Sequence, residues 1–239
     1  MTGVGALGVL YGVGLGPGDP DLLTLKAVRI IQRANILIAP KSAGKHSVAL
    51  HVLESLVDRD KQEVMELGFP MRSDRDTRVR AREDASLQVV EKLRRGQDVV
   101  CVTMGDPLLY STFSHLYRGV TDALPEVTVE IIPGVSSITA CAAAAHIRLA
   151  CEDERIAIVS ATAELADLET ILDSFDCVVV LKVSAAPTRV LAALDKTGRR
   201  DQAVLVERCG MPDQRILRRI TDWSGESCSY FSTLLVRKA

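Results

Sequence analysis

The sequence has 239 residues, of which 47% are hydrophobic and 25% charged, with a formal net charge of -2. This size allows one large domain or two small ones with a buried core, and the near-neutral charge excludes a strongly basic nucleic-acid surface. Charge or Gly interrupts each apolar stretch before the ~20 residues of a membrane span, and the N-terminus lacks signal-peptide features. We therefore expect a cytoplasmic protein that binds neither nucleic acid nor membrane.

Short β-rich runs alternate with longer helical patterns in the first half of the chain. Strands are expected at 10–14, 35–39, 63–67, 98–104 and 127–132, and helices at about 20–33, 46–58, 77–95 and 110–123. This alternation predicts a parallel sheet with helices on its faces. Asp19 or Asp21 can cap the first helix, and Gly96 stands where a C-terminal cap would fall.

The second half continues the alternation but ends differently. Strands are expected at 155–161, 177–183 and 202–207, and helices at 135–146, about 164–174 and about 186–196. The last apolar runs, 215–220 and 230–238, have no helix between them, which favours antiparallel pairing and a mixed sheet. The sequence thus predicts two α/β domains, 1–133 and 134–239, with the active-site cleft between them.

The stretch "LYGVGLGPGDPDLLTLKA" (10–27) joins an apolar run to a helix through four glycines. A ligand can approach such a bare backbone closely. The dinucleotide fingerprint G-x-G-x-x-G does not fit, because Pro17 or Asp19 stands where its third Gly belongs, and the only Gly-Lys pair is followed by His46, unlike a phosphate loop. A purely structural turn with an aspartate cap remains an equal alternative for this loop alone.

A second loop, "TMGDPLLYST" (103–112), repeats Gly-Asp-Pro after the strongest predicted strand. In an open α/β sheet, ligands bind beyond the carboxyl ends of the strands, where both loops should lie. A carboxylate beside bare backbone suits a cationic or hydroxyl-rich ligand.

Six segments occur in the order of a known family: "GVGLGPGDPDLLTLKA", "MGDPLLYST", "IIPGVSS", "VVVLKV", "LVER" and "YFSTLLV". Together they resemble the tetrapyrrole methyltransferases that use S-adenosylmethionine, along the whole chain. Within that family the chain is most similar to the precorrin-2 and cobalt-precorrin-2 C(20)-methyltransferases of cobalamin biosynthesis. The stretch "APKS" (39–42) departs from the uroporphyrinogen-methylating subgroup, so we expect uroporphyrinogen not to be the substrate.

This resemblance implies that each chain has two α/β domains and binds S-adenosylmethionine in the cleft between them. It also implies that two chains form a homodimer. It also implies a set of cofactor-binding residues, named here by their numbers in this chain. They are Pro17 at the cleft border; Met104, Gly105, Asp106 and Leu109 along the methionine and ribose; Ser111 and Thr112 in the same loop; and Ser136, Ser137, Lys182 and Cys209 on the adenosine side. Many relatives have Met at the place of Lys182.

Methyl transfer from a sulfonium needs a well-placed nucleophilic carbon and a good leaving group, and it requires no metal. No general base stands out in the sequence. We interpret Asp106 as a cofactor ligand rather than a base. Tyr230 is the candidate catalytic residue, which could hydrogen-bond the macrocycle or its developing charge, although a structural role for a half-buried strand Tyr is at least as plausible.

The segment 72–95 holds eight basic and five acidic residues. A solvated helix face is the favoured interpretation of such a mixture. The tetrapyrrole substrate nevertheless carries many carboxylates, which Arg can bind in a forked geometry. Arg72, Arg75 and Arg78 are therefore our candidates for a basic, substrate-binding lip.

The leading hypothesis is methylation of precorrin-2, or of its cobalt-bearing counterpart, at carbon 20. One alternative is a sister precorrin methyltransferase that acts at another ring position. A second is a cofactor-binding protein without turnover, and a third is a diphthamide-type methyltransferase, which shares the fold but acts on a protein histidine.

Overall fold

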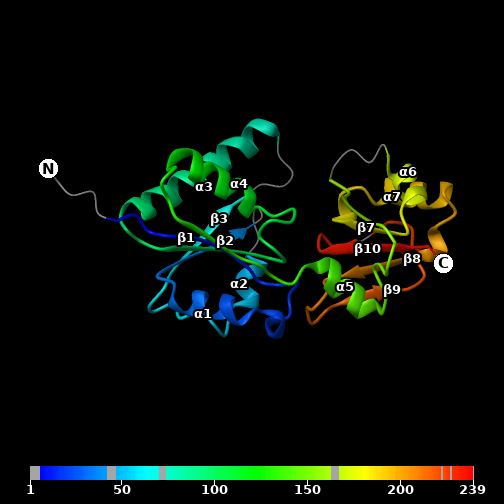
Figure 1. The fold of residues 1–239 in the computed structure, drawn as a ribbon, viewed down its shortest axis with the longest axis horizontal. Coiled ribbons are helices and arrows are strands. Elements are labelled where there is room, and N and C mark those ends of the chain that lie inside the picture. Colours follow the sequence, from blue (N-terminus) through cyan, green and yellow to red (C-terminus); the bar gives the residue numbers. More distant parts are fainter. Residues whose placement is uncertain are drawn as a thin grey trace. The chain divides into compact units, whose positions relative to one another are not determined.

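The computed structural model describes residues 6–41, 47–69, 74–162, 167–221, 223–226 and 228–238. It divides into two compact units, Met1–Ser136 and Ser137–Ala239, so the division falls after residue 136 rather than after the expected 133. Figure 1 shows that each unit has its own sheet with its own helices. Among the described residues, no helix is both long and apolar enough to cross a membrane.

The first unit is built on a five-stranded sheet in which every pairing is parallel, as predicted. Its strands are β1 (Leu10–Gly14), β2 (Ile36–Lys41), β3 (Glu63–Gly68), β4 (Val99–Thr103) and β5 (Val129–Ile132), in the order β3-β2-β4-β1-β5. Because β1 lies between β4 and β5, the loops that follow these three strands leave the sheet side by side at its carboxyl edge.

Helices cover both faces of this sheet: α1 (Leu25–Arg33) and α2 (Val48–Val52) lie on one side in Figure 1, and α3 (Arg75–Arg94) and α4 (Phe113–Ala123) on the other. The side chains of successive strand residues point to opposite faces. Ile38 and Cys101 therefore share a core with α3 and α4, whereas Leu37 and Val100 share one with α1.

The predicted helix at 20–33 is wrong in one respect, because it is two elements. Asp19 caps a short 3-10 turn, η1 (Pro20–Leu22), by accepting a hydrogen bond from the Asp21 amide. Leu23 is then extended, and the Thr24 hydroxyl caps α1 by accepting from the Ala27 amide. Thr is itself a good N-cap, so it starts a helix at the next residue.

The second unit holds a five-stranded mixed sheet, as predicted. Its strands are β6 (Ile156–Ser160), β7 (Cys177–Leu181), β8 (Ala203–Glu207), β9 (Arg215–Leu217) and β10 (Ser232–Arg237), in the order β6-β7-β10-β8-β9. The pair β6–β7 is parallel and the other pairs are antiparallel. The last two strands do not pair with each other, since each pairs with β8.

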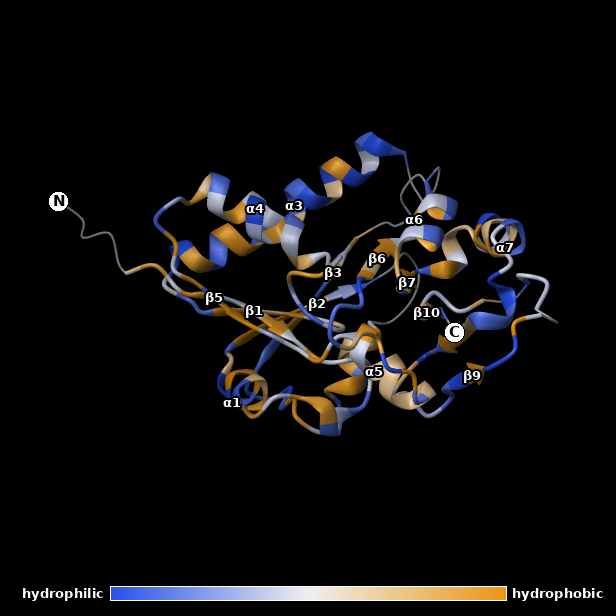
Figure 2. Cartoon of the chain, turned by 45° about the vertical axis from the view of Figure 1, so that its right-hand side comes forward, coloured by the Kyte–Doolittle hydropathy of each residue, from blue (hydrophilic) through white to orange (hydrophobic). Residues whose placement is uncertain are grey.

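The described residues of this unit form three α-helices, α5 (Ser137–Ala145), α6 (Leu168–Ser174) and α7 (Pro187–Lys196), and the short 3-10 turns η2 (Val183–Ala185) and η3 (Arg200–Gln202). Leu172 of α6 and Leu194 of α7 share a core with Val178 and Leu234. The hydrophobic character of such strands is visible as orange ribbon in β1, β6 and β7 (Figure 2).

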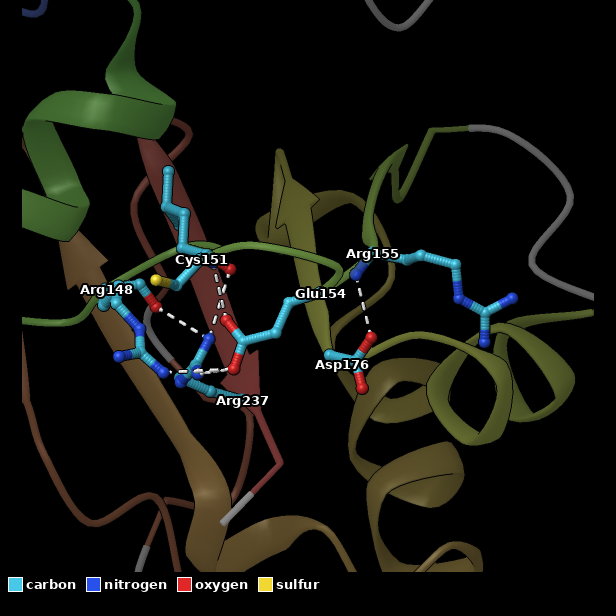
Figure 3. A network of polar contacts seen from close by, with 7 residues as sticks. Arg148, Cys151, Glu154, Arg155, Asp176 and Arg237 are labelled. Carbon is cyan, nitrogen blue, oxygen red and sulfur yellow. Dashed lines mark hydrogen bonds and ion pairs between the residues drawn. The ribbon is translucent and has the colours of Figure 1, made fainter.

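A polar network pins the segment between α5 and β6 to the middle of the second sheet (Figure 3). Arg237, near the end of β10, pairs with Glu154 and donates to the Arg148 carbonyl at 3.1 Å. Glu154 also accepts from the Cys151 amide at 2.7 Å, and the Arg155 amide donates to Asp176 at 2.8 Å. These contacts lie where β6 and β7 begin, at the opposite edge from their carboxyl ends.

Candidate functional site

The loops after β1 and β4 are joined backbone to backbone at the carboxyl edge of the first sheet. The Gly105 amide donates to the Gly16 carbonyl at 2.7 Å, and the Gly16 amide donates back at 3.3 Å. A Cβ atom on Gly14 would lie 2.6 Å from the Gly105 oxygen, and one on Gly134 would lie 2.2 Å from it. The glycines at 14 and 134 are therefore required by contact between loops rather than by a ligand.

Gly105 is different, because its side is open. A Cβ placed on it would meet nothing within 4 Å, and its φ of +70° is one that glycine adopts without strain. Bare backbone beside open space is the arrangement that lets a ligand approach closely. Of the two loops at which the sequence analysis expected a ligand, the loop after β4 therefore offers open backbone, at Gly105.

Asp106 ties this loop to the loop after β5. One carboxylate oxygen accepts from the Leu108 amide at 2.9 Å and the other from the Gly134 amide at 3.1 Å. Each carboxylate oxygen has two acceptor sites, so the half-buried group keeps capacity for a cationic or hydroxyl-bearing ligand. Asp106 therefore has a structural role that the sequence did not indicate, and it remains able to bind a ligand.

The remaining expected residues of the first unit lie around these loops. Ser111 shares a hydrogen bond of 2.9 Å with the Thr103 hydroxyl and accepts from the Phe113 amide at 3.0 Å, so its side chain organises the start of α4. Thr112 stands at the N-cap of α4 without a side-chain cap bond. The others are the buried Pro17 and the half-buried Met104, Leu109 and Ser136.

Lys182 lies at the carboxyl edge of the second sheet, directly after β7. It adopts a left-handed conformation, with φ 56° and ψ 42°, and its amide donates to the Ser232 carbonyl at 2.9 Å. Partial burial lowers the pKa of its ammonium group. Ser232 pairs in register with Glu207 of β8, so β10 links Lys182 to the end of β8.

Cys209 follows β8 at the same edge, and its thiol contacts the thiol of Cys141 in α5. The hydrogen bond from Cys141 lowers the pKa of Cys209, and the same contact, together with burial, raises that of Cys141. The two residues are only 1% (Cys141) and 7% (Cys209) exposed, which leaves little thiol surface for a ligand. Ser137 begins α5 and is half-buried.

Comparison with known proteins agrees with this arrangement of loops and strands. Residues 9–221 match the tetrapyrrole (corrin/porphyrin) methylases. The chain belongs to this family. It is 33% identical to a precorrin-2 C(20)-methyltransferase of Sinorhizobium sp., a match that covers 99% of this chain and 97% of that protein. It is 32% identical to a cobalt-precorrin-2 C(20)-methyltransferase of Salmonella typhimurium, with 97% of each chain covered.

A solved methylase structure has the same fold. The uroporphyrin-III C-methyltransferase from Thermus thermophilus, crystallised with S-adenyl homocysteine, superposes with a TM-score of 0.72 at 23% identity, covering 97% of this chain and 98% of that one. The fold prediction of two α/β units, one with a parallel and one with a mixed sheet, is therefore confirmed.

Tyr230 of this methylase lies outside the strand in which the sequence placed it, because β10 begins at Ser232. The Phe231 amide donates to the Ser229 hydroxyl at 3.2 Å, so the chain turns locally before the strand starts. The Tyr230 ring packs edge-on against Phe231 and is 44% exposed. Its partial burial raises the pKa of the phenol.

Two of the three predicted substrate-binding arginines lie in the first turn of α3, which Figure 2 shows as hydrophilic. Arg75 is exposed and Arg78 half-buried, while Arg72 lies outside the described residues. Asp74 caps the helix by accepting from the Thr77 amide at 2.8 Å. Basic side chains at a helix N-terminus oppose the helix dipole, so the two arginines are not placed there for helix stability.

Glu207 is a residue that the sequence analysis missed. It ends β8, is 3% exposed, pairs with Arg215 of β9 and accepts from the Ser229 amide at 2.6 Å. The sequence did contain a signal for it, an acidic residue at the end of the apolar strand "AVLVE". An unpaired buried carboxylate is costly, so a carboxylate at such a position is expected to have a cation or hydrogen-bond donors as partners.

Proposed function

We propose that this methylase transfers a methyl group from S-adenosylmethionine to carbon 20 of precorrin-2 or cobalt-precorrin-2, in cobalamin biosynthesis. The observation that carries the proposal is the similarity, over nearly the whole chain, to two proteins named as C(20)-methyltransferases. One of these names includes cobalt and the other does not, at almost equal identity. Whether the substrate contains cobalt is therefore a question for the assay.

The residues of the first carboxyl edge fit the cofactor chemically. S-adenosylmethionine supplies a methyl group on a positively charged sulfur, and it also has an ammonium group and ribose hydroxyls. The open backbone at Gly105 and the remaining acceptor capacity of Asp106 suit these groups. We propose that Pro17, Met104, Leu109, Ser111, Thr112 and Ser136 complete this side. Ser137, Lys182 and Cys209 contact the adenosine in this proposal, with Cys209 doing so through its backbone because its thiol is buried.

The remaining side chains act on the substrate in this proposal. The Tyr230 phenol, whose pKa burial raises further above its ordinary value near 10, is neutral at physiological pH and can donate a hydrogen bond to the macrocycle. Arg75 and Arg78, with Arg72, bind the substrate carboxylates. Holding the two reactants in line can supply several kcal/mol of the barrier lowering. Methylation also releases a proton from carbon 20, and none of these residues is assigned as its acceptor.

The first experiment is anaerobic incubation of the purified protein with S-adenosylmethionine and either precorrin-2 or cobalt-precorrin-2, with mass spectrometry and NMR of the product. One added methyl at carbon 20 is expected. The substrate that is methylated faster shows whether the enzyme acts on precorrin-2 or on cobalt-precorrin-2. A methyl at another ring position identifies a sister methyltransferase instead. Cofactor binding without any methylation contradicts the proposal and favours a non-catalytic protein.

A matched pair of glycine variants tests the cofactor site itself. Gly105 and Gly198 both have positive φ, +70° and +65°, and both have open space where a Cβ would stand. Gly105→Ala and Gly198→Ala should each cost about 1 kcal/mol of folding free energy. Only Gly105→Ala should weaken S-adenosylmethionine binding, by tenfold or more in calorimetry; equal affinities in both variants would place the cofactor elsewhere.

A homodimer and a cytoplasmic location also belong to the proposal. The family resemblance supports the dimer, and light scattering on the eluting peak of a size-exclusion column tests it. Fractionation of cells that produce the protein tests the location. We expect neither nucleic acid nor membrane lipid to bind.

A further inference from the structure

The Glu207 carboxylate connects three segments at the carboxyl edge of the second sheet. One oxygen is paired with the Arg215 guanidinium of β9, through both its Nε and Nη2 atoms. The other oxygen accepts from the Ser229 amide at 2.6 Å. Each carboxylate oxygen thus has a partner, and the Glu207 side chain is only 5% exposed.

The Ser229 amide begins the short segment that carries Tyr230. Further along, the Ser229 hydroxyl accepts from the Phe231 amide at 3.2 Å, and the Phe231 carbonyl accepts from the Arg208 amide at 2.8 Å. The segment is therefore held to the end of β8 on both sides of Tyr230. The Tyr230 side chain itself makes its ring contact with Phe231.

A buried carboxylate needs such partners for a second reason. Taking its charge out of water is costly unless a cation and hydrogen-bond donors surround it. The Ser229 amide is one of these donors, so movement of the Tyr230 segment would leave the carboxylate short of a partner. The position of the segment and the charge of Glu207 are thus coupled.

We propose that Glu207 is a positioning residue of the methylation site. Fixed by Arg215, it holds residues 229–231 so that the Tyr230 phenol is presented to the substrate. This inference rests on the proposed function, in which Tyr230 donates a hydrogen bond to the macrocycle.

The test is a double-mutant cycle on kcat/KM for the tetrapyrrole, with Glu207→Ala, Tyr230→Phe and the double variant. If Glu207 acts through Tyr230, Glu207→Ala should lower kcat/KM about tenfold, and Tyr230→Phe should cause almost no further loss in the Glu207→Ala background. The affinity for S-adenosylmethionine should change less than threefold. Fully additive losses, or wild-type kinetics in Glu207→Ala, would overturn the inference.

Two further variants separate positioning from a general loss of structure. Glu207→Gln keeps an oxygen that can accept from the Ser229 amide and should retain most of the activity. Asp213→Asn is the control. It removes a carboxylate between β8 and β9 that accepts from Arg208 at 2.6 Å but does not contact Ser229, and this variant should have wild-type kinetics. A loss in Glu207→Gln as large as in Glu207→Ala contradicts positioning through the acceptor.

A measurement without turnover keeps this inference separate from the proposed function. In protein with labelled tyrosine, the Tyr230 NMR signal is assigned by its absence in Tyr230→Phe and followed through an alkaline titration. Burial raises its pKa in the wild type, and Glu207→Ala should bring it back toward the ordinary value near 10. An unchanged titration overturns positioning, whereas a shift without any methylation by the wild type overturns only the proposed function.

Discussion

The carboxyl edges of the two sheets are built by different means. At the first edge, three loops touch through backbone atoms at Gly14, Gly105 and Gly134, without room for a Cβ at 14 or 134. At the second edge, side-chain contacts connect the segments: Glu207 pairs with Arg215, and the Cys141 thiol contacts the Cys209 thiol. The first edge should tolerate no added atom at Gly14 or Gly134, and the second edge should respond to changes of charge.

The difference also separates two uses of glycine. Where backbone meets backbone, glycine is needed for space, and where the chain faces open space, as at Gly105, it is needed for its conformation. A glycine-rich motif can therefore contain positions that serve the fold and positions that serve a ligand.

The largest effect is expected from Gly134→Ala, because the new Cβ would lie 2.2 Å from the Gly105 oxygen. Backbone atoms cannot move aside cheaply, so we expect a loss of about 3 kcal/mol in the free energy of unfolding. Urea denaturation measures it. Gly68→Ala is the control, since a Cβ there meets nothing within 4 Å, and a similar loss in both variants would break the comparison.

Asp106→Ala should come next, because it removes the acceptor of two backbone amides, those of Leu108 and Gly134. We expect a loss of about 1–3 kcal/mol in folding free energy, and cofactor binding weakened at least tenfold. Asp122→Asn, at an exposed pair on α4, should change neither quantity. A stable Asp106→Ala variant would show that the loops hold together without this carboxylate.

At the second edge, Lys182→Met should raise stability, because it removes a half-buried ammonium group and keeps the length of the side chain. Burial lowers the pKa of Lys182 below its unfolded value of 10.5, so the penalty is present while the group is charged. The gain should be full at pH values below the lowered pKa, shrink as pH rises from that value toward 10.5, and be absent above 10.5. Denaturation of each variant near pH 7 and above pH 10.5 measures the gain. Lys196→Met, at an exposed lysine, is the control and should not show this gain.

The smallest effect is expected from Glu154→Gln, in the network at the opposite edge of the second sheet. The hydrogen bond from Arg237, followed by that of the Cys151 amide, lowers the pKa of this carboxylate below 4.5. Its contribution to stability is therefore present above about pH 4.5 and lost as pH falls through the lowered value. Wild type and variant should differ in denaturation midpoint near pH 7, and the difference should shrink as pH falls below 4.5, whereas Glu169→Gln should match wild type throughout.

Much of this fold follows from local patterns in the sequence. Buried parallel strands such as "DVVCVTM" are continuous apolar runs, and Gly96 ends α3 in the conformation expected of a cap, with φ +74°. Local cues also misled at 20–33, where Thr24 competes with Asp19 as a helix start.

The details of the site depended on contacts between distant residues. No pattern near Gly14 shows that the Gly105 oxygen lies against it, and no pattern near Tyr230 shows that Glu207 holds the preceding amide. For the same reason the sequence could identify Asp106 as a ligand candidate but not as the link between two loops.

The place of β10 has a consequence for how the protein is made. This strand, Ser232–Arg237, is the last along the described chain, yet it lies in the interior of its sheet between β7 and β8. During synthesis, β7 and β8 leave the ribosome with no strand between them, and their inner edges stay unpaired until residues 232–237 emerge. In the first unit, the last of the described strands ends at residue 132, so its sheet can form before the central strand of the second sheet has been synthesised.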